Sequence, residues 1–331
     1  MLKAVRLSYV LRLAALVALM APATLVACSG GSGGCGSNCT VPAFHTPTPS
    51  PIPTPSPTPS PTPSPTPSPS PTPTIAPLSC NQGASAITLG PALAPFALLA
   101  GSTITNVGNT LVTFAPGAVT GTTNDDLIGV SPGTAVTGFY PPGTDTDGPN
   151  AIYAATFNTN AAVPLAAENA LTTAYNTAAG RPATTSFVGT PDLSQQSVPG
   201  FPTGTLPAGV YKATSSAAIA AGNLTLDGGG NPQSVFIFQI GSTLTTTLNG
   251  TTSGNVLLQN GASACNIYWQ IGSSATLGGA TFFGNVFAFS SITINASNFT
   301  GRALAGGPSL GTGAVTIPVA GGSLITNPGG S

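Results

Sequence analysis

The sequence repeats one pattern three times, beginning with Val235-Phe-Ile-Phe-Gln-Ile-Gly-Ser-Thr-Leu-Thr245. The second copy is Asn266-Ile-Tyr-Trp-Gln-Ile-Gly-Ser-Ser-Ala-Thr-Leu277, and the third is Asn285-Val-Phe-Ala-Phe-Ser-Ser-Ile-Thr-Ile294. Each copy contains an apolar strand, a corner of small residues, and a strand in which apolar residues alternate with Ser or Thr. A fixed repeat of this kind is typical of a stack of β-coils.

A third short strand follows two of these copies. It reads Ala280-Thr-Phe-Phe283 in one coil and Ser297-Asn-Phe-Thr300 in the next. Each ends at a glycine, and Gly284 and Gly301 lie 17 residues apart, a length typical of one turn of a three-sided stack. The pattern therefore predicts a mostly β protein with the architecture of a three-sided β-solenoid.

The three sides differ in their polarity. The first strand is apolar on both faces, so both of its faces should be covered. The second and third strands alternate, so they should point Leu, Ile or Phe inward and short polar side chains outward. The expected outward residues include Thr243, Thr245, Thr276 and Thr293 on the second side, and Thr281, Asn298 and Thr300 on the third.

One segment has the pattern of a helix. In residues 161–179, Ala, Leu and Tyr recur at steps of three and four, Pro164 suits a first helical turn, and Gly180 supplies a stop. We expect this helix to cover the first side by packing on the strands at 235–240, 266–271 and 285–289. The chain would leave the solenoid, run along it and re-enter.

Residues 1–77 have the composition of the leading part of an exported and tethered protein. Residues 1–27 combine a basic start with a short apolar run, as in a signal peptide. They end at Leu25-Val-Ala-Cys28, which resembles the lipobox of bacterial lipoproteins and implies lipid on Cys28; an ordinary secretory cleavage site is the alternative. We expect a surface or outer-membrane lipoprotein, or a secreted protein, which contacts a membrane only through that lipid.

The remaining boundaries follow from composition. Residues 28–45 form a Gly/Ser/Cys tether, residues 46–77 are a stalk of Thr-Pro and Ser-Pro, and residues 78–331 are the solenoid domain, with 321–331 as a loose tail. A disulfide between Cys80 and Cys265 is plausible in an exported chain.

The composition argues against several classes of function. Only 4% of residues are charged and the net charge is −1, so there is no basic surface for nucleic acid. The one histidine, His45, lies in low-complexity sequence, and the acidic residues are thinly spread. Asp145-Thr-Asp147 is better explained as a turn than as a calcium loop. We therefore expect no catalysis, no metal and no cofactor. We also expect the protein to be a monomer.

Regularly spaced threonine is the abundant surface chemistry. Neighbouring strands stack about 4.8 Å apart and alternate residues lie nearly 7 Å apart, spacings close to the oxygen repeats of ice. The β-branch restricts the threonine rotamer, so such an array is rigid. It could order water as ice does, or the threonines could simply be good strand residues.

The sequence resembles the microbial ice-binding proteins over residues 86–317. The matching motifs include Phe96-Ala-Leu-Leu-Ala-Gly-Ser-Thr-Ile-Thr-Asn106, Gly129-Val-Ser-Pro-Gly-Thr-Ala-Val-Thr-Gly138, Ala178-Ala-Gly-Arg-Pro-Ala-Thr184 and Leu224-Thr-Leu-Asp-Gly-Gly-Gly-Asn231, together with the coils quoted above. The resemblance implies a discontinuous, right-handed three-sided solenoid with a long helix alongside, ice binding and no enzymatic activity. The alternative is a cell-surface adhesin that binds glycan or another cell.

The resemblance also suggests site residues. Some members carry a Thr-(Ala or Gly)-x-(Thr or Asn) pattern on one flat side, and Thr134-Ala-Val-Thr137 and Thr120-Gly-Thr-Thr123 fit it. We expect the third side, with Thr134 and Thr137, to bind ice in preference to the second. The late coils are shorter than the pattern requires, and residues 110–124 look like an insertion.

Overall fold

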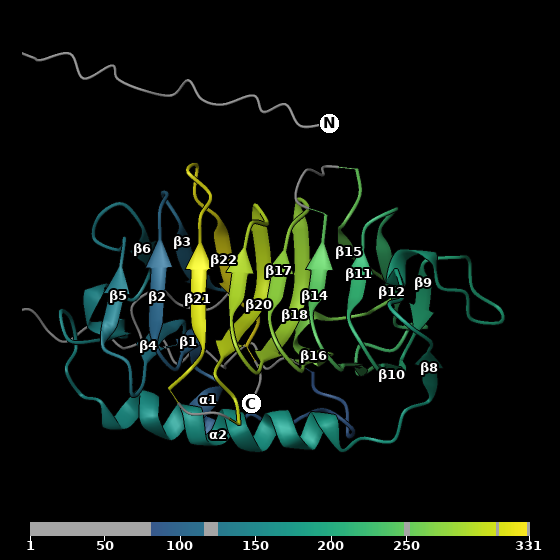
Figure 1. Ribbon diagram of the computed structural model, residues 1–331, viewed down its shortest axis with the longest axis horizontal. Coiled ribbons are helices and arrows are strands. Elements are labelled where there is room, and N and C mark those ends of the chain that lie inside the picture. The colour runs from purple at the N-terminus through teal and green to yellow at the C-terminus, as the bar shows by residue number, and fades with distance from the viewer. Residues whose placement is uncertain (1–80, 116–124, 248–251, 309–310, 330–331) are drawn as a thin grey trace, which may run out of the picture. The chain divides into compact units, whose positions relative to one another are not determined.

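The computed structural model describes residues 81–115, 125–247, 252–308 and 311–329. These residues form parallel sheets of 12, seven and three strands, which make up three sides of one coil stack (Figure 1). The predicted mostly β, three-sided solenoid is confirmed. The expected signal peptide, Cys28, the tether, the stalk and Thr120–Thr123 lie outside the described residues.

The first side is a sheet in which the chain order is broken. Its strands, in spatial order, are β8 (Thr185–Phe187), β10 (Gly209–Ala213), β13 (Phe236–Ile240), β16 (Ile267–Ile271), β18 (Thr281–Ala288), β20 (Asn298–Ala305), β1 (Phe96–Ala100), β4 (Leu127–Val130) and β7 (Ile152–Tyr153). The last coil therefore pairs with the first, since β20 lies beside β1. The solenoid is discontinuous, as the resemblance implied, and the early and late strands meet in its middle (Figure 1).

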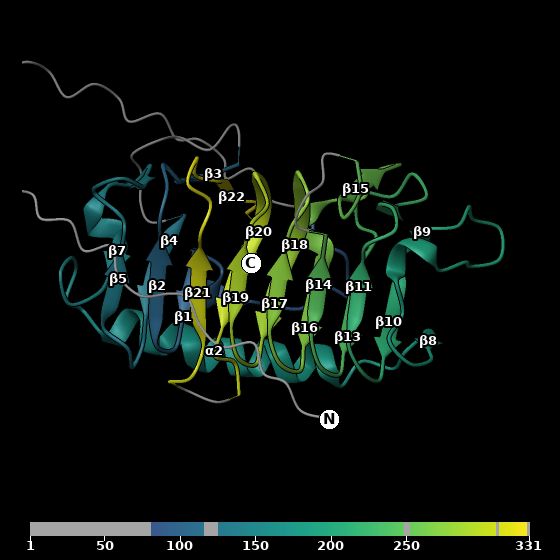
Figure 2. The same cartoon turned by 45° about the horizontal axis from the view of Figure 1, so that its top comes forward.

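The second side is a separate seven-stranded sheet (Figure 2). In spatial order it contains β11 (Ala217–Ile219), β14 (Leu244–Thr246), β17 (Ala275–Leu277), β19 (Ile292–Ile294), β21 (Ala314–Ile317), β2 (Thr103–Asn106) and β5 (Ala135–Thr137). It crosses the same break in chain order, because β21 pairs with β2.

The third side consists of two parts. One is the three-stranded sheet of β9 (Thr205–Pro207), β12 (Leu224–Asp227) and β15 (Val256–Gln259). The other combines the first halves of β18 and β20 with β22 (Leu324–Asn327), β3 (Leu111–Phe114) and β6 (Thr144–Asp145).

Two strands turn a corner without ending. β18 and β20 each belong to two sides, and Gly284 and Gly301 pair at the bend. Gly284 has a φ of 118°, and a Cβ there would lie 2.6 Å from the Ile267 Cγ2. A Cβ at Gly301 would lie 1.9 Å from the Gly284 carbonyl oxygen, so the tight bend requires glycine at both positions.

The long helix α2 (Ala162–Ala179) matches the predicted helix and its predicted place. It lies along the first side (Figure 1). Its buried residues Ala167, Leu171, Ala174 and Ala178 share a cluster with sheet residues Ile237, Tyr268, Phe287, Leu99 and Leu304. It extends the expected contacts to β1 and β4. Its C-terminal carbonyls are capped from the sheet, since Gln239 Nε2 donates to Ala178 O at 2.8 Å and Ala179 O at 3.2 Å.

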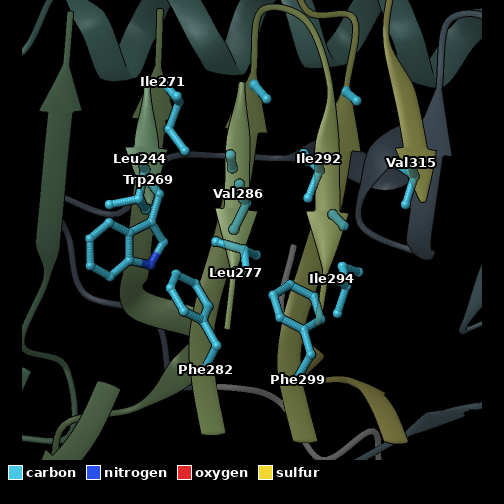
Figure 3. Packing of buried hydrophobic residues seen from close by; sticks show 14 of the residues in the cluster. Leu244, Trp269, Ile271, Leu277, Phe282, Val286, Ile292, Ile294, Phe299 and Val315 are labelled. Carbon is cyan, nitrogen blue, oxygen red and sulfur yellow. The ribbon is translucent and has the colours of Figure 1, made fainter. Parts of the chain in front are cut away.

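The interior of the coils is filled by a line of aromatic rings. Trp269 stacks on Phe238 with centroids 4.0 Å apart and contacts Phe282 at 5.2 Å; Phe282 stacks on Phe299 at 6.0 Å. Figure 3 shows Trp269, Phe282 and Phe299 pointing into the same interior as the Leu and Ile residues of the second side. The alternation predicted for the second and third strands is therefore confirmed.

Shorter helical turns complete the described elements. They are α1 (Gly90–Leu93) and the 3₁₀ turns η1 (Pro149–Ala151), η2 (Leu193–Gln195) and η3 (Ala264–Asn266). The expected loose tail is wrong for residues 324–327, which form β22 between β20 and β3. Across the described ranges, no helix is long and apolar enough to cross a membrane.

A buried arginine connects the segment before β1 to the last coils by hydrogen bonds. Arg302, on β20, donates to Ala94 O at 2.8 Å, to Asn285 Oδ1 at 2.8 Å and to Gly329 O at 3.1 Å. Asn327 Nδ2 reaches the same early segment and donates to Pro95 O at 3.1 Å. These bonds hold the residues just before β1 against the last coils.

Cys265 is disulfide-bonded. Its predicted partner, Cys80, lies outside the described residues. The neighbouring residues are in contact, because Asn266 Nδ2 donates to Asn81 O at 2.9 Å and Gly83 N donates to Asn266 Oδ1 at 3.2 Å. The chain just after Cys80 therefore runs beside the chain just after Cys265.

Candidate functional site

The seven-stranded sheet carries an unbroken row of threonines on its outer face. Each of six neighbouring strands places one threonine in register with the next: Thr245, Thr276, Thr293, Thr316, Thr105 and Thr137. On the seventh strand the row continues as Ala218. We call this row the threonine ladder. It arises because six of the seven second-side strands have the same alternation of apolar residues with threonine.

A second row of small side chains runs parallel to the ladder. It lies two residues earlier on each strand and contains Ser216, Thr243, Ser274, Ser291, Ala314, Thr103 and Ala135. Thr243 Oγ1 donates to Ser216 Oγ at 2.8 Å, so hydroxyls also link neighbours along this row. Both rows contain only Thr, Ser and Ala, and the result is an array of side chains of nearly equal height.

The ladder threonines are supported from below. The residues between the two rows point inward, and Leu244, Ala275, Ile292, Val315 and Ile104 are all buried. The ladder threonines themselves are half-buried or exposed. Packing on both flanks leaves such β-branched side chains little rotational freedom.

The third side is less regular. Thr281 pairs with Asn298, and the same row continues through Leu324 and Leu111 to Thr144. Leu111 and Leu324 are each 39% exposed, so large apolar side chains interrupt the polar row. The adjacent row contains Thr300, Thr326 and Thr113 but begins with the ring of Phe283.

The third side is also interrupted between β15 and β18. Asn255 Oδ1 there accepts from Ala280 N at 2.7 Å and Thr281 N at 3.0 Å, in place of the usual bonds between strands. Asn255 Nδ2 in turn donates to Asn223 Oδ1 at 2.9 Å. A side-chain amide thus bridges two sheets whose strands do not pair at this point.

The structure separates the residues that the sequence grouped together. Thr281, Asn298 and Thr300 lie together on the third side. Thr137 does not join them, because it pairs with Thr105 on the second side, and Thr134 directly precedes the same strand. Grouping Thr134 and Thr137 with the third side is therefore wrong. Thr245, Thr276 and Thr293 do lie together, with Thr243 in the adjacent row.

Four acidic residues that looked scattered in the sequence come together at one end of the solenoid. Asp125 N donates to Asp147 Oδ2 at 3.1 Å, and Thr146 Oγ1 donates to Asp126 Oδ2. Asp126 and Asp145 are buried. Burial, with Asp147 nearby, raises the pKa of Asp126 to about 7, and burial with Asp126 nearby raises the pKa of Asp145 to about 8. Within the described ranges no group of three or more His, Cys, Asp or Glu could hold a metal ion.

A further carboxyl is buried between helix and sheet. Glu168 of α2 is fully buried, and neither carboxyl oxygen has a hydrogen-bond partner in the described part of the chain. Burial raises the pKa of Glu168 to about 8. The side chain is therefore mainly protonated at neutral pH.

Comparison with known proteins identifies the family. Residues 98–318 match the family model described as Ice-binding-like. The chain belongs to this family. A protein of Nostoc sp. (strain HG1) named "Ice-binding protein" is 40% identical over 227 residues, which cover 68% of this chain and 71% of that protein.

Solved structures of other ice-binding proteins have the same fold. An ice-binding protein from an Antarctic biological consortium is 37% identical, with a TM-score of 0.56 over 76% of this chain and 96% of that one. The ice-binding protein of the ascomycete Antarctomyces psychrotrophicus is 30% identical, with a TM-score of 0.56 over 73% of this chain and 98% of that one. The resemblance inferred from the coil motifs is confirmed.

Proposed function

We propose that this protein binds ice crystals through the seven-stranded sheet and so restrains crystal growth and recrystallisation. The observation that carries the proposal is the threonine ladder, which is unbroken over six strands. Its repeat along the sheet is about 4.8 Å and the spacing to the adjacent row is nearly 7 Å. Membership of the ice-binding-like family supports the same function.

The physical reason is complementarity between two rigid, flat surfaces. Each threonine presents a methyl group and a hydroxyl in a fixed rotamer, so water above the sheet can adopt the order of an ice layer. Little conformational entropy is lost on docking, because the side chains are already held. The third side lacks this uniformity, since Leu111 and Leu324 project among its polar residues. We therefore favour the second side, in place of the third side expected from the sequence.

Ice recrystallisation inhibition and thermal hysteresis test this proposal directly. Thr276→Tyr and Thr293→Tyr each place a ring in the middle of the ladder and should abolish most activity. Thr281→Tyr and Thr300→Tyr, on the third side, are matched controls that should retain it. All four residues are half-buried on a strand, so the fold should tolerate each change equally.

The outcomes separate the alternatives. Loss of activity only in the third-side variants would return the site to the residues expected from the sequence. Loss in neither pair would mean that the threonines are only exposed strand residues. A folded protein without any effect on ice at micromolar concentration would favour the adhesin alternative. We propose that the protein has no catalytic role. We also propose that it acts as a monomer, since one solenoid carries the whole ladder.

We also propose that the protein is exported and anchored. The support is the sequence of residues 1–27 and the lipobox-like Leu25-Val-Ala-Cys28. The chain should fractionate with membranes, and Cys28→Ala should release it into the soluble or secreted fraction. Equal partitioning of the two forms would favour plain secretion.

A further inference from the structure

A cavity of about 550 Å³ lies on the first side of the solenoid, just beyond the end of α2. Its floor is formed by Val210, Val235 and Ile237, which point outward from the first-side sheet and pack in the same cluster as the helix. Sites for small molecules in proteins have volumes of about 300–1,000 Å³. The cavity is therefore large enough for one or two sugar rings.

Arg181 lines this cavity and is held in place by its backbone. Its carbonyl oxygen accepts from Gln239 Nε2 at 2.7 Å, and its N–H donates to Ala178 O at 3.3 Å. Its guanidinium makes only some of the hydrogen bonds it could make. Nη2 donates to Ala86 O at 3.4 Å, and the buried Nε has no acceptor in the described part of the chain. An arginine has five N–H donors, so donors remain for a ligand.

The charge of the cavity lining favours an anion. The described residues contain three cations, Arg181, Lys212 and Arg302, and of these only Arg181 lines the cavity; Arg302 is buried among backbone carbonyls. Of the described residues that line the cavity, none is Asp or Glu. The rest of the rim is neutral and polar, with Ser85, Thr184, Asn231 and Gln233. Such hydroxyl and amide groups are suited to hydrogen-bond the hydroxyls of a sugar.

We propose that this cavity binds a carboxylate-bearing sugar, such as a uronic acid unit of an acidic polysaccharide. Arg181 would pair with the carboxylate, since guanidinium and carboxylate match in shape and charge. The apolar floor would contact the C–H face of the ring. The cavity and the threonine ladder lie on different sides of the solenoid, so the inference is independent of ice binding and both ligands can be held at once.

Calorimetric titration of the full chain with sodium D-glucuronate tests the proposal, with glucose, acetate and inorganic phosphate as separate probes. We expect glucuronate to bind and the other three to bind at least about tenfold more weakly, equivalent to about 1.4 kcal/mol. Arg181→Gln should weaken glucuronate binding by about tenfold or more, because it removes a charge-assisted bond. Lys212→Gln is the matched control: it removes the same charge from the same side, outside the cavity, and should change little.

A second variant tests whether lost binding in Arg181→Gln could come from a change in folding at the end of α2. Ala208→Trp fills the exposed mouth of the cavity while keeping Arg181, and it should also abolish binding. Three results would overturn the proposal: no binding of glucuronate, equal loss in Arg181→Gln and Lys212→Gln, or binding of phosphate or glucose as tight as that of glucuronate. Ice recrystallisation inhibition measured on the same variants should remain unchanged.

Discussion

Thr316 on β21 pairs in register with Thr105 on β2, although the two strands come from the late and early parts of the domain. This pair joins the threonines of β14, β17, β19 and β21 to those of β2 and β5. The threonine ladder is therefore assembled from distant segments of the sequence. Its continuity depends on the docking of the early coils against the last one.

The early strands should accordingly contribute to ice binding as much as the late ones. Thr105→Tyr should reduce recrystallisation inhibition about as strongly as Thr276→Tyr, because both rings project from the same row. Thr225→Tyr, on β12 of the third side, is the control and should retain activity. Full activity of Thr105→Tyr would restrict the ice-binding surface to the late coils.

The seam between helix and sheet should not tolerate a charge. Ala174 is 1% exposed against the first-side sheet, so Ala174→Arg should destabilise the fold by about 3 kcal/mol or more. Ala166→Arg, on the exposed face of α2, is the matched control. Melting temperatures measured by circular dichroism distinguish them, and equal values for the two variants would contradict the packing described here.

Glu168 should make the fold less stable as the pH rises. The unfolded chain releases this proton near the ordinary pKa of 4.5, whereas the folded chain keeps it until about pH 8. Between these values the unfolded state binds fewer protons, so the free energy of unfolding falls with rising pH and levels off above about 8. Asp126 and Asp145 act in the same direction.

Glu168→Gln should therefore give a shallower decline of the melting temperature from acidic to mildly alkaline pH, with the largest gain at the alkaline end. Asp227→Asn is a suitable control, because Asp227 is only half-buried and hydrogen bonds from Gly229 and Asn260 lower its pKa. A decline as steep in Glu168→Gln as in the unchanged protein would place the pH dependence elsewhere.

The disulfide of Cys265 should join it to Cys80. Mass spectrometry of a digest without reductant should show one cross-linked peptide containing both residues. Cys80→Ser should lower stability by about 3 kcal/mol, because the cross-link closes a long loop of the unfolded chain. A free thiol at Cys80 in the oxidised protein would contradict this pairing.

The sequence predicted those parts of the fold whose signal is local. The repeated strands, the inward and outward alternation and the helix at 161–179 each depend on a pattern within one segment. The family resemblance supplied the break in chain order, which no local pattern contains, since every coil presents nearly the same strand to its neighbours. Ser323-Leu-Ile-Thr-Asn327 was missed as a strand because it is short and surrounded by Gly and Pro.

The candidate site was harder to predict than the fold. The second-side threonines were recognised individually, but the ladder depends on which strands are neighbours. Thr137 belongs to it only because β5 pairs with β2. In the same way, Asp126 contacts Thr146, between Asp145 and Asp147 and 20 residues later in the chain, and the buried Arg302 donates to the carbonyl oxygen of Ala94, 208 residues earlier. Such contacts between distant segments leave no periodicity in the sequence.

The path of the chain also limits how this surface can be enlarged. The 18-residue helix α2, with the segments before and after it, connects β7 at one end of the first-side sheet with β8 at the other. A helix advances about 1.5 Å per residue and a coil adds about 4.8 Å. Each added coil would therefore require about three more helical residues, or an equal extension of the segments that join α2 to β7 and β8.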